Sequence, residues 1–463
     1  MSSSSFFLSS LVFLELEPRY VCLRGVQWES CKAAEFCENK GLQWKIDWTN
    51  AESLSNFIMY FDLYCDSQFK IGLFGSLFLA GIVLGSVTLT RLGDIYGRKP
   101  IFLIGMAIQI LTTVGVLMNS NIMVAYALFF IIGFGVTGKQ FVGFSYLVEM
   151  QPHYTQAYVS SFEFIFEAFV YLFVVIYFSL ISKTWQYVGI PSLGLGVIGC
   201  LSLLSQPESP RFLISVGEYE KARQVFKRIA RVNNQDPSKF DKVSFAEEDI
   251  QQKMLIIQDE ITSVTDNLKS NRKKSDLKEL LQNSQLRANL ILANFIWCSL
   301  MINYYILAFY LKYFPGNIYE NTLYMIGADL LAYIVSGTLM KKTDLKKSLV
   351  LAQIISIIGS SLYQLVYTND KIIPFVVIFC RFGISMSFNS VYIGNNRLFP
   401  TQFQSTTFGF LNFLSHCLSV GAPIIAEISD PIPILIFLGC CVITLISAIF
   451  LKEVNRDLLN QIK

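Results

Sequence analysis

The sequence is poor in charged residues and in histidine. Only 15% of its 463 residues are Asp, Glu, Lys or Arg, whereas 53% are hydrophobic. This scarcity of charge excludes most soluble domains, whose surfaces need charged side chains. The two histidines, the lack of a metal-ligand spacing of His and Cys, and the lack of a phosphate-binding Walker loop argue against an enzyme. The net charge of +3 gives no reason to expect nucleic-acid binding. We expect no cofactor and no metal.

Long apolar runs take the place of the missing charge. A hydrocarbon core about 30 Å thick requires about 20 apolar residues per helix. Such runs lie near residues 70–90, 101–118, 122–148, 157–182, 186–204, 289–311, 318–340, 348–367, 372–395, 404–427 and 432–451, after a partial run at 5–16. Continuous runs favour helices over the alternating strands of a barrel. The prediction is an all-α integral membrane protein with about twelve spans, six on each side of a polar interval.

The polar interval divides the chain into three predicted parts. An N-terminal six-helix half covers residues 1–204, a cytosolic helical linker covers 205–288, and a C-terminal half with a short tail covers 289–463. Only about a dozen apolar residues precede Pro18, too few to cross a bilayer. We therefore expect a truncated first helix, either because the chain begins late or because half a helix has been lost.

The distribution of Lys and Arg in the short loops predicts the orientation. Cytosolic loops of membrane proteins are enriched in these residues. The basic loops follow the second, eighth and tenth spans and contain Arg91, Arg98, Lys99, Lys341, Lys342, Lys346, Lys347 and Arg397. Both termini and the linker are accordingly placed in the cytosol. The expected location is the plasma membrane, with an organelle membrane as the alternative.

The region 17–68 then faces outward and contains four cysteines. They are Cys22, Cys31, Cys37 and Cys65. An even number of cysteines outside the cytosol predicts two disulfides, for which three pairings exist. Free thiols at some of these positions are the alternative.

The stretch LGDIYGRKP, residues 92–100, follows the second span. Asp94 and the basic pair Arg98 and Lys99 are suited to join helix ends through charge-assisted hydrogen bonds and helix dipoles. Together with the six-plus-six layout, the stretch resembles the signature loop of the major facilitator superfamily, although two positions of the usual pattern differ. The resemblance implies a cytosolic clamp of the outward-open state, with Asp94 and Arg98 at its centre.

A second stretch, PESPRFLISVGEYEKARQVFKRIARVN at 207–233, resembles the organic cation and organic anion transporter family. EPRYVC, FDLYC, DLKELL and FNSVYIGNNRLFPTQFQ extend this similarity over nearly the whole chain. The resemblance implies alternating access around a site near the membrane midplane, with Glu149 and Arg211 as further gating residues. The sequence departs from the family where Arg397 and Gln404 replace an expected Glu and Arg.

Charged side chains within the apolar runs mark candidate substrate contacts, because each is unfavourable in a membrane. They are Lys139, Glu163, Glu167, Asp329 and Arg381, and His416 joins them. None lies in the third, sixth, ninth or twelfth span, which the resemblance identifies as peripheral helices. The pattern therefore predicts a polar cavity between the two halves.

Each of these groups has a functional and a structural interpretation. Glu163 and Glu167 are four residues apart and share a helix face. With Lys139 at a similar depth, they form either a cation or proton site or a salt bridge between the fourth and fifth spans. Asp329 and Arg381 either line the cavity or form a structural pair.

Uncharged candidates also have two interpretations. In the functional interpretation His416 tunes selectivity or senses protons, and in the structural one it is a packing residue that forms a hydrogen bond. Tyr304 and Tyr392 stack on a cationic or aromatic substrate, or they fill the core. In the linker, an apolar stripe over 246–268 predicts a helix that rests on neighbouring helices or binds a protein partner.

These observations lead to one functional prediction and two alternatives. We expect a secondary-active or facilitative transporter of small organic ions that works by alternating access, with proton coupling as an option. The first alternative is a transport-inactive, transporter-like accessory subunit of a membrane assembly, which the short first helix favours. The second is a sugar porter, which the outer cysteines and the charged cavity disfavour.

Overall fold

The structure is a bundle of long helices. It is a computed structural model that describes residues 5–241, 243, 245, 248, 277–366, 372–399 and 401–453. Within this part, eleven helical segments are long and apolar enough to cross a membrane, and they match the eleven long runs expected from the sequence. The chain is therefore a multi-pass membrane protein with an all-α spanning region.

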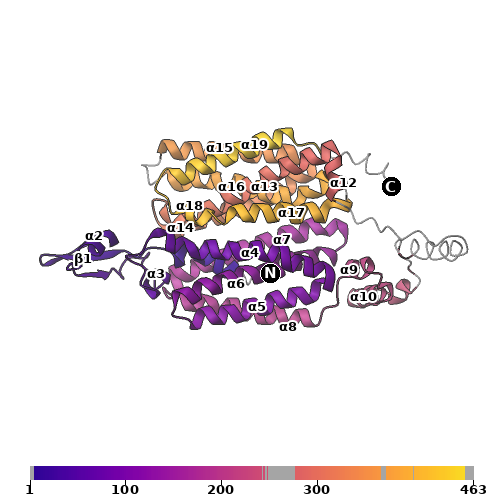
Figure 1. Cartoon of the computed structure of the whole chain (residues 1–463), viewed down its shortest axis with the longest axis horizontal. Coiled ribbons are helices and arrows are strands. Elements are labelled where there is room, and N and C mark those ends of the chain that lie inside the picture. Colours follow the sequence, from indigo (N-terminus) through magenta and orange to yellow (C-terminus); the bar gives the residue numbers. More distant parts are fainter. Residues whose placement is uncertain are drawn as a thin grey trace, which may run out of the picture.

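The spanning helices form two groups that lie side by side (Figure 1). The N-terminal half contains α4 (Gln68–Tyr96), α5 (Arg98–Met118), α6 (Ile122–Glu149), α7 (His153–Ile176) and α8 (Gly189–Leu204). The C-terminal half contains α13 (Ser284–Tyr310), α14 (Ile318–Lys342), α15 (Leu345–Val366), α16 (Ile373–Leu398), α17 (Thr401–Ser419), α18 (Ala422–Ala426) and α19 (Ile432–Phe450). The halves meet where α4 packs on α17 and α18 and where α7 packs on α14.

A short helix, α1 (Ser5–Leu14), is embedded between the halves. Its ten residues extend about 15 Å, which is roughly half of a hydrocarbon core. Phe13 is fully buried and stacks on Phe178 of the N-terminal half and on Tyr319 of α14. This helix therefore contributes packing on both sides of the junction.

The closest helix contact in the N-terminal half depends on glycine. A Cβ atom on Gly81 of α4 would lie 2.0 Å from the carbonyl oxygen of Phe130 in α6. A Cβ on Gly133 of α6 would lie 1.9 Å from the carbonyl oxygen of Phe78. Small residues allow such close backbone approach within a membrane. The crossing fixes the position of α6, which supplies side chains to the site.

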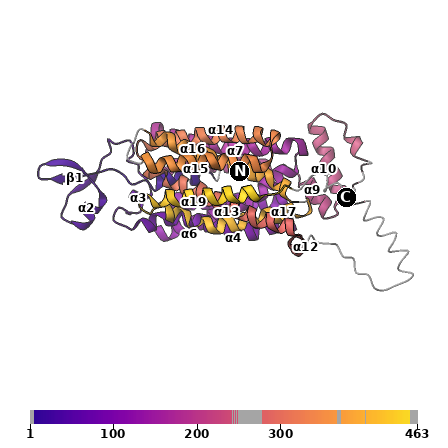
Figure 2. The ribbon, with the colours of Figure 1, turned by 90° about the horizontal axis from the view of Figure 1, so that it is seen from above.

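A small disulfide-bonded domain projects from one end of the bundle (Figures 1 and 2). It contains the helices α2 (Ala33–Glu38) and α3 (Phe57–Tyr60) and three strands, β1 (Tyr20–Arg24), β2 (Gln27–Cys31) and β3 (Trp44–Ile46). The strands form one sheet in the order β2-β1-β3. Disulfides join Cys22 to Cys31 and Cys37 to Cys65. The prediction of two disulfides is confirmed, and the structure selects one of the three pairings. We call this end of the bundle the disulfide end.

The opposite end has the first linker helices, and we call it the linker end (Figure 1). Helix α9 (Pro210–Ser215) begins at Ser209, whose hydroxyl accepts a hydrogen bond from the N–H of Phe212. Helix α10 (Tyr219–Val232) buries Ala222 and Val225 on its apolar face. Shorter elements follow at Pro237–Phe240 (η4) and Leu277–Gln282 (α12). Apart from Glu248, the helix expected at 246–268 lies outside the described residues.

Candidate functional site

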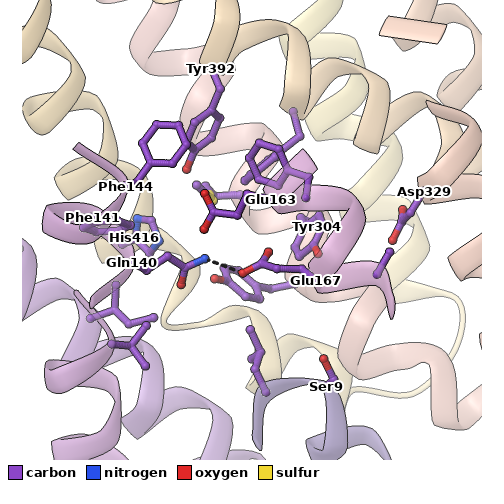
Figure 3. A pocket seen from close by; sticks show the side chains of 18 of the residues that line it. Ser9, Gln140, Phe141, Phe144, Glu163, Glu167, Tyr304, Asp329, Tyr392 and His416 are labelled. Atoms are coloured by element: carbon purple, nitrogen blue, oxygen red, sulfur yellow. Dashed lines mark hydrogen bonds between the residues drawn. The ribbon is translucent and has the colours of Figure 1, made fainter. Parts of the chain in front are cut away.

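A cavity of about 130 Å³ lies between the two halves. Seven long helices and α1 line it, so that residues distant in sequence share one surface (Figure 3). Its polar lining consists of Ser9, Gln140, Glu163, Glu167, Asp329 and His416 together with five tyrosines, Tyr171, Tyr304, Tyr305, Tyr333 and Tyr392. The structure therefore brings six of the eight predicted substrate contacts to one cavity: Glu163, Glu167, Asp329, Tyr304, Tyr392 and His416.

Two carboxylates from α7 project into this cavity (Figure 3). The side-chain amide of Gln140 in α6 donates a hydrogen bond of 3.0 Å to Oε1 of Glu167. For Glu163, the described part of the chain supplies no hydrogen bond and no ion pair closer than 4 Å. The spacing of four residues on one helix places both acids on the same wall.

The third carboxylate of the lining is already neutralised. Asp329 in α14 accepts hydrogen bonds of 2.7 and 2.8 Å from Nε and Nη2 of Arg381 in α16. The hydroxyl of Ser385 donates to the same carboxylate. Both charged side chains are almost fully buried, and the guanidinium lies 4.2 Å from the ring centre of Tyr304. The charges of Asp329 and Arg381 therefore neutralise each other within the C-terminal half.

Lys139 is placed apart from the cavity. Its side chain is fully buried in the N-terminal half, and its ammonium donates a hydrogen bond to Oε1 of Gln109 in α5. It does not belong to the cavity lining, although Glu163 and Glu167 do. The rise of a helix does not determine which neighbour the side chain of Lys139 faces.

Aromatic rings form much of the remaining lining. Tyr392 of α16 has its ring centre 4.8 Å from that of Phe388 and 5.7 Å from that of Phe164. The ring of His416 is 5.5 Å from that of Phe141, and its Nδ1 lies 2.8 Å from the carbonyl oxygen of Asn412. Five further lining residues were not predicted from the sequence: Gln140, Phe141, Phe144, Phe164 and Phe408. Because the helices that contain them are rich in apolar residues on every side, no sequence signal separates these rings from packing residues.

The signature loop lies at the linker end. Arg98 forms an ion pair with Asp94, and its Nε lies 3.2 Å from Oε1 of Glu149 in α6. The ammonium of Lys99 donates a hydrogen bond of 3.0 Å to the carbonyl oxygen of Leu204. All these predicted gating residues belong to the N-terminal half. The role of a clamp stays a prediction.

A residue that was not predicted from the sequence completes this network. Glu208, in the loop before α9, accepts hydrogen bonds from the backbone N–H groups of Arg98 and Lys99 at the start of α5. Its neighbour Ser209 donates a hydrogen bond of 2.6 Å to Glu149. Arg211, the remaining predicted gating residue, lies in α9 beside this network. A carboxylate at a helix N-terminus is a favourable arrangement that the PESPR stretch could have suggested.

Direct contacts close the cavity toward the disulfide end. The hydroxyl of Tyr319 in α14 donates a hydrogen bond of 2.8 Å to the carbonyl oxygen of Ala51. The ammonium of Lys312 lies 3.2 Å from Oε2 of Glu15, across the junction of the halves. Phe13 stacks on Tyr319 beneath these contacts. These contacts hold the two halves together at this end.

The family model of the Major Facilitator Superfamily matches residues 50–423. The chain belongs to this superfamily. Two matched proteins, each 24% identical, are the human organic cation/carnitine transporter 2, over 86% of this chain and 70% of the relative, and the rat organic anion transporter 3, over 89% and 75%. The relatives are transporters, and the chain is a membrane transporter that works by alternating access.

Solved structures of this superfamily have the same fold. The inward-open xylose transporter of E. coli superimposes with a TM-score of 0.64 over 99% of this chain and 97% of its own. A crystal structure of the D-xylose-proton symporter gives a TM-score of 0.61 over 98% and 96%. Sequence identity is 11% and 12%. These matches confirm the predicted 6+6 architecture of the superfamily. Among the described residues, no cluster of His, Cys, Asp and Glu is suited to a metal ion.

Proposed function

We propose that this transporter moves small organic cations through the cavity between its halves. The observation that supports this most is the charge balance of the lining. Asp329 is neutralised by Arg381, whereas Glu163 projects into the cavity with no ion pair closer than 4 Å among the described residues. A buried carboxylate without a cation favours a positively charged ligand, which supplies the missing charge.

The aromatic part of the lining supports the same class of substrate. Tyr392 and Phe144 lie in the cavity with Glu163 (Figure 3). Phe164 also belongs to the lining. A cation over an aromatic face is attracted by the ring quadrupole, most strongly where water is excluded. The names of the relatives, an organic cation/carnitine transporter and an organic anion transporter, agree with an organic ion and leave its charge open. The carboxylates of this cavity favour the cation.

The orientation that best fits the fold places the disulfide end outside the cell. Disulfides persist in oxidising compartments, and the basic signature loop lies at the opposite end. In this orientation both termini and the linker lie in the cytosol of a plasma-membrane protein. Because the disulfide end is closed, substrate enters the present conformation from the linker end.

Uptake into vesicles that contain the purified full chain tests the proposal. A tetraalkylammonium cation, an aromatic carboxylate and a zwitterionic amine are compared, with saturable uptake expected for the cation. Glu163→Gln and Glu167→Gln are each expected to weaken cation affinity about tenfold or more, since a charged hydrogen bond contributes about 1.5–3 kcal/mol.

Glu320→Gln, on the exposed outer end of α14, is the matched control and is expected to leave uptake unchanged. Uptake that prefers the carboxylate, or a cation affinity that survives both cavity substitutions, would contradict the proposal. Folding of each variant is checked by its elution as a single species and by its melting temperature.

A further inference from the structure

A second cluster of charged side chains lies away from the cavity, at the disulfide end. Lys312, in the short helix η5 (Leu311–Tyr313) after α13, has its ammonium 2.6 Å from Oε1 of Glu427 and 3.2 Å from Oε2 of Glu15. All three side chains are at most 4% exposed. Two acids thus share a single base in a site that water does not reach.

This cluster lies across the junction of the halves. Glu15 follows α1, where the side chain of Asn56, from the N-terminal half, donates hydrogen bonds to the carbonyl oxygens of Phe13 and Leu16. Lys312 and Glu427 belong to the C-terminal half. The side chain of Glu427 also packs 3.2 Å from the Cβ position of Gly72 in α4. The three side chains can therefore stay together only while the disulfide end is closed.

The hydrogen bonds of the cluster leave two acceptors unsatisfied. Oε2 of Glu427 accepts from the hydroxyl of Tyr313, and Oε2 of Glu15 accepts from Lys312. Oε1 of Glu427 makes no hydrogen bond among the described residues but lies 2.6 Å from the ammonium of Lys312. Oε1 of Glu15 is buried and has no hydrogen-bond partner among the described residues. A buried acceptor without a donor is unfavourable by roughly 1–3 kcal/mol, and more when it is charged. The atom is placed where a proton would relieve this cost.

The neighbouring groups do not correct the excess of negative charge. The other titratable side chains that face the cluster are Tyr313, Tyr126 of α6 and Glu17. The tyrosines are neutral, and Glu17 adds a further acid. Two carboxylates and one ammonium carry a net charge of −1, and two like charges in one buried site cannot both ionise without a large penalty.

We propose that Glu15, Lys312 and Glu427 form a proton-binding site that latches the disulfide end shut. One proton, shared by the two carboxylates, leaves one negative and one positive charge when the halves close. When the halves separate, water solvates both acids and the proton is released. Because the site lies at the disulfide end, the proton exchanges with the compartment on that side. External acidity therefore favours the closed end, and no proton needs to cross the membrane.

The test measures opening of the disulfide end without any substrate, so that it does not depend on the cation proposal. Two spin labels are attached through unnatural amino acids at Lys70, at the outer end of α4, and at Glu320, at the outer end of α14. The ratio of wide to short label distances is recorded against pH in the full-length chain. For one linked proton, this ratio is expected to rise with pH by up to about tenfold per unit.

Removal of either acid is expected to abolish this response. Glu15→Gln and Glu427→Gln each leave one carboxylate with one ammonium, so the end should stay closed at every pH. The control Glu38→Gln, an exposed acid of the disulfide domain, should keep the wild-type response. If Glu15→Gln does not give a folded protein, Glu427→Gln supplies the same comparison.

Three results would each overturn the proposal. The first is a label distance that does not change with pH in the wild-type chain. The second is a pH response that survives in both cluster variants. The third is a response that follows Na⁺ concentration at constant pH, which would identify a sodium site in place of a proton site. Normal cation uptake in these cases would leave the transport proposal intact.

Discussion

The pair Asp329 and Arg381 shows how single residues divide the charges of this protein into structural and functional ones. Both side chains are within the membrane-spanning region, yet the bidentate contact and Ser385 satisfy them inside one half. Glu163 lies in the same cavity and has no such partner within the described ranges. Charge within a membrane helix therefore indicates function only where its neighbours leave it uncompensated.

We predict that replacing Asp329 alone lowers the stability of the protein more than replacing Asp329 and Arg381 together. Asp329→Asn leaves a buried guanidinium unpaired and should lower stability by about 3–5 kcal/mol. Adding Arg381→Gln removes the unpaired charge and should recover much of this loss. Thermal unfolding in detergent measures both, with the exposed Asp344→Asn as control. Equal melting temperatures for the single and the double variant would refute the argument.

At the level of whole helices, the packing of α4 against α6 depends on small residues. The α4 and α6 crossing depends on Gly81 and Gly133, because any Cβ there would overlap a backbone carbonyl of the facing helix. We predict that Gly133→Ala lowers stability by about 1–3 kcal/mol, the usual range for overpacking. The matched control is Gly194→Ala in α8, where nothing lies within 4 Å of the added carbon. Melting temperatures that fall equally in both variants would argue against the close crossing.

The two disulfides are expected to stabilise the disulfide domain by different amounts. Cys37 and Cys65 close a segment with a sequence separation of 28, whereas Cys22 and Cys31 are 9 apart. Loop-closure entropy grows with the logarithm of loop length, so the longer loop should contribute about 1 kcal/mol more. Limited proteolysis of the disulfide domain compares the paired Cys→Ser variants. Faster cleavage is expected for the 37/65 variant, and the reverse order would contradict the entropy argument.

For the whole molecule, the contacts at the disulfide end define one state of an alternating-access cycle. Lys312, Tyr319 and Phe13 join the halves there, between the cavity and the disulfide domain. Rigid movement of one half against the other would exchange these contacts for contacts at the linker end. The glycine crossing stays intact in such a movement because it lies within one half.

Labelling from each side of the membrane tests this state. Ala168, a small residue of the cavity lining in α7, is replaced by cysteine in a chain whose six free cysteines are changed to serine. An impermeant thiol reagent should react faster from the linker end than from the disulfide end. Substrate at saturating concentration should raise the slower rate. Equal rates from both sides at the start would mean that the closed contacts do not control access.

The sequence alone determined the features that depend on local composition. The apolar runs gave eleven spans, because a helix must satisfy its backbone within a membrane whatever its neighbours are. Four cysteines in one outer loop were enough for two disulfides, and the signature loop and the PESPR stretch were enough for the superfamily. None of these predictions depends on which residues are in contact in the tertiary structure.

Only the tertiary structure decided which charges remain available. It selected the disulfide pairing, turned Lys139 toward Gln109, paired Asp329 with Arg381 and placed Glu163 in an aromatic cavity. It also brought Glu15 to Lys312 and Glu427 from sequence positions about 300 and 400 residues away. The physical reason is that helical periodicity fixes the direction of a side chain on its own helix, whereas its electrostatic partner depends on how separate helices pack.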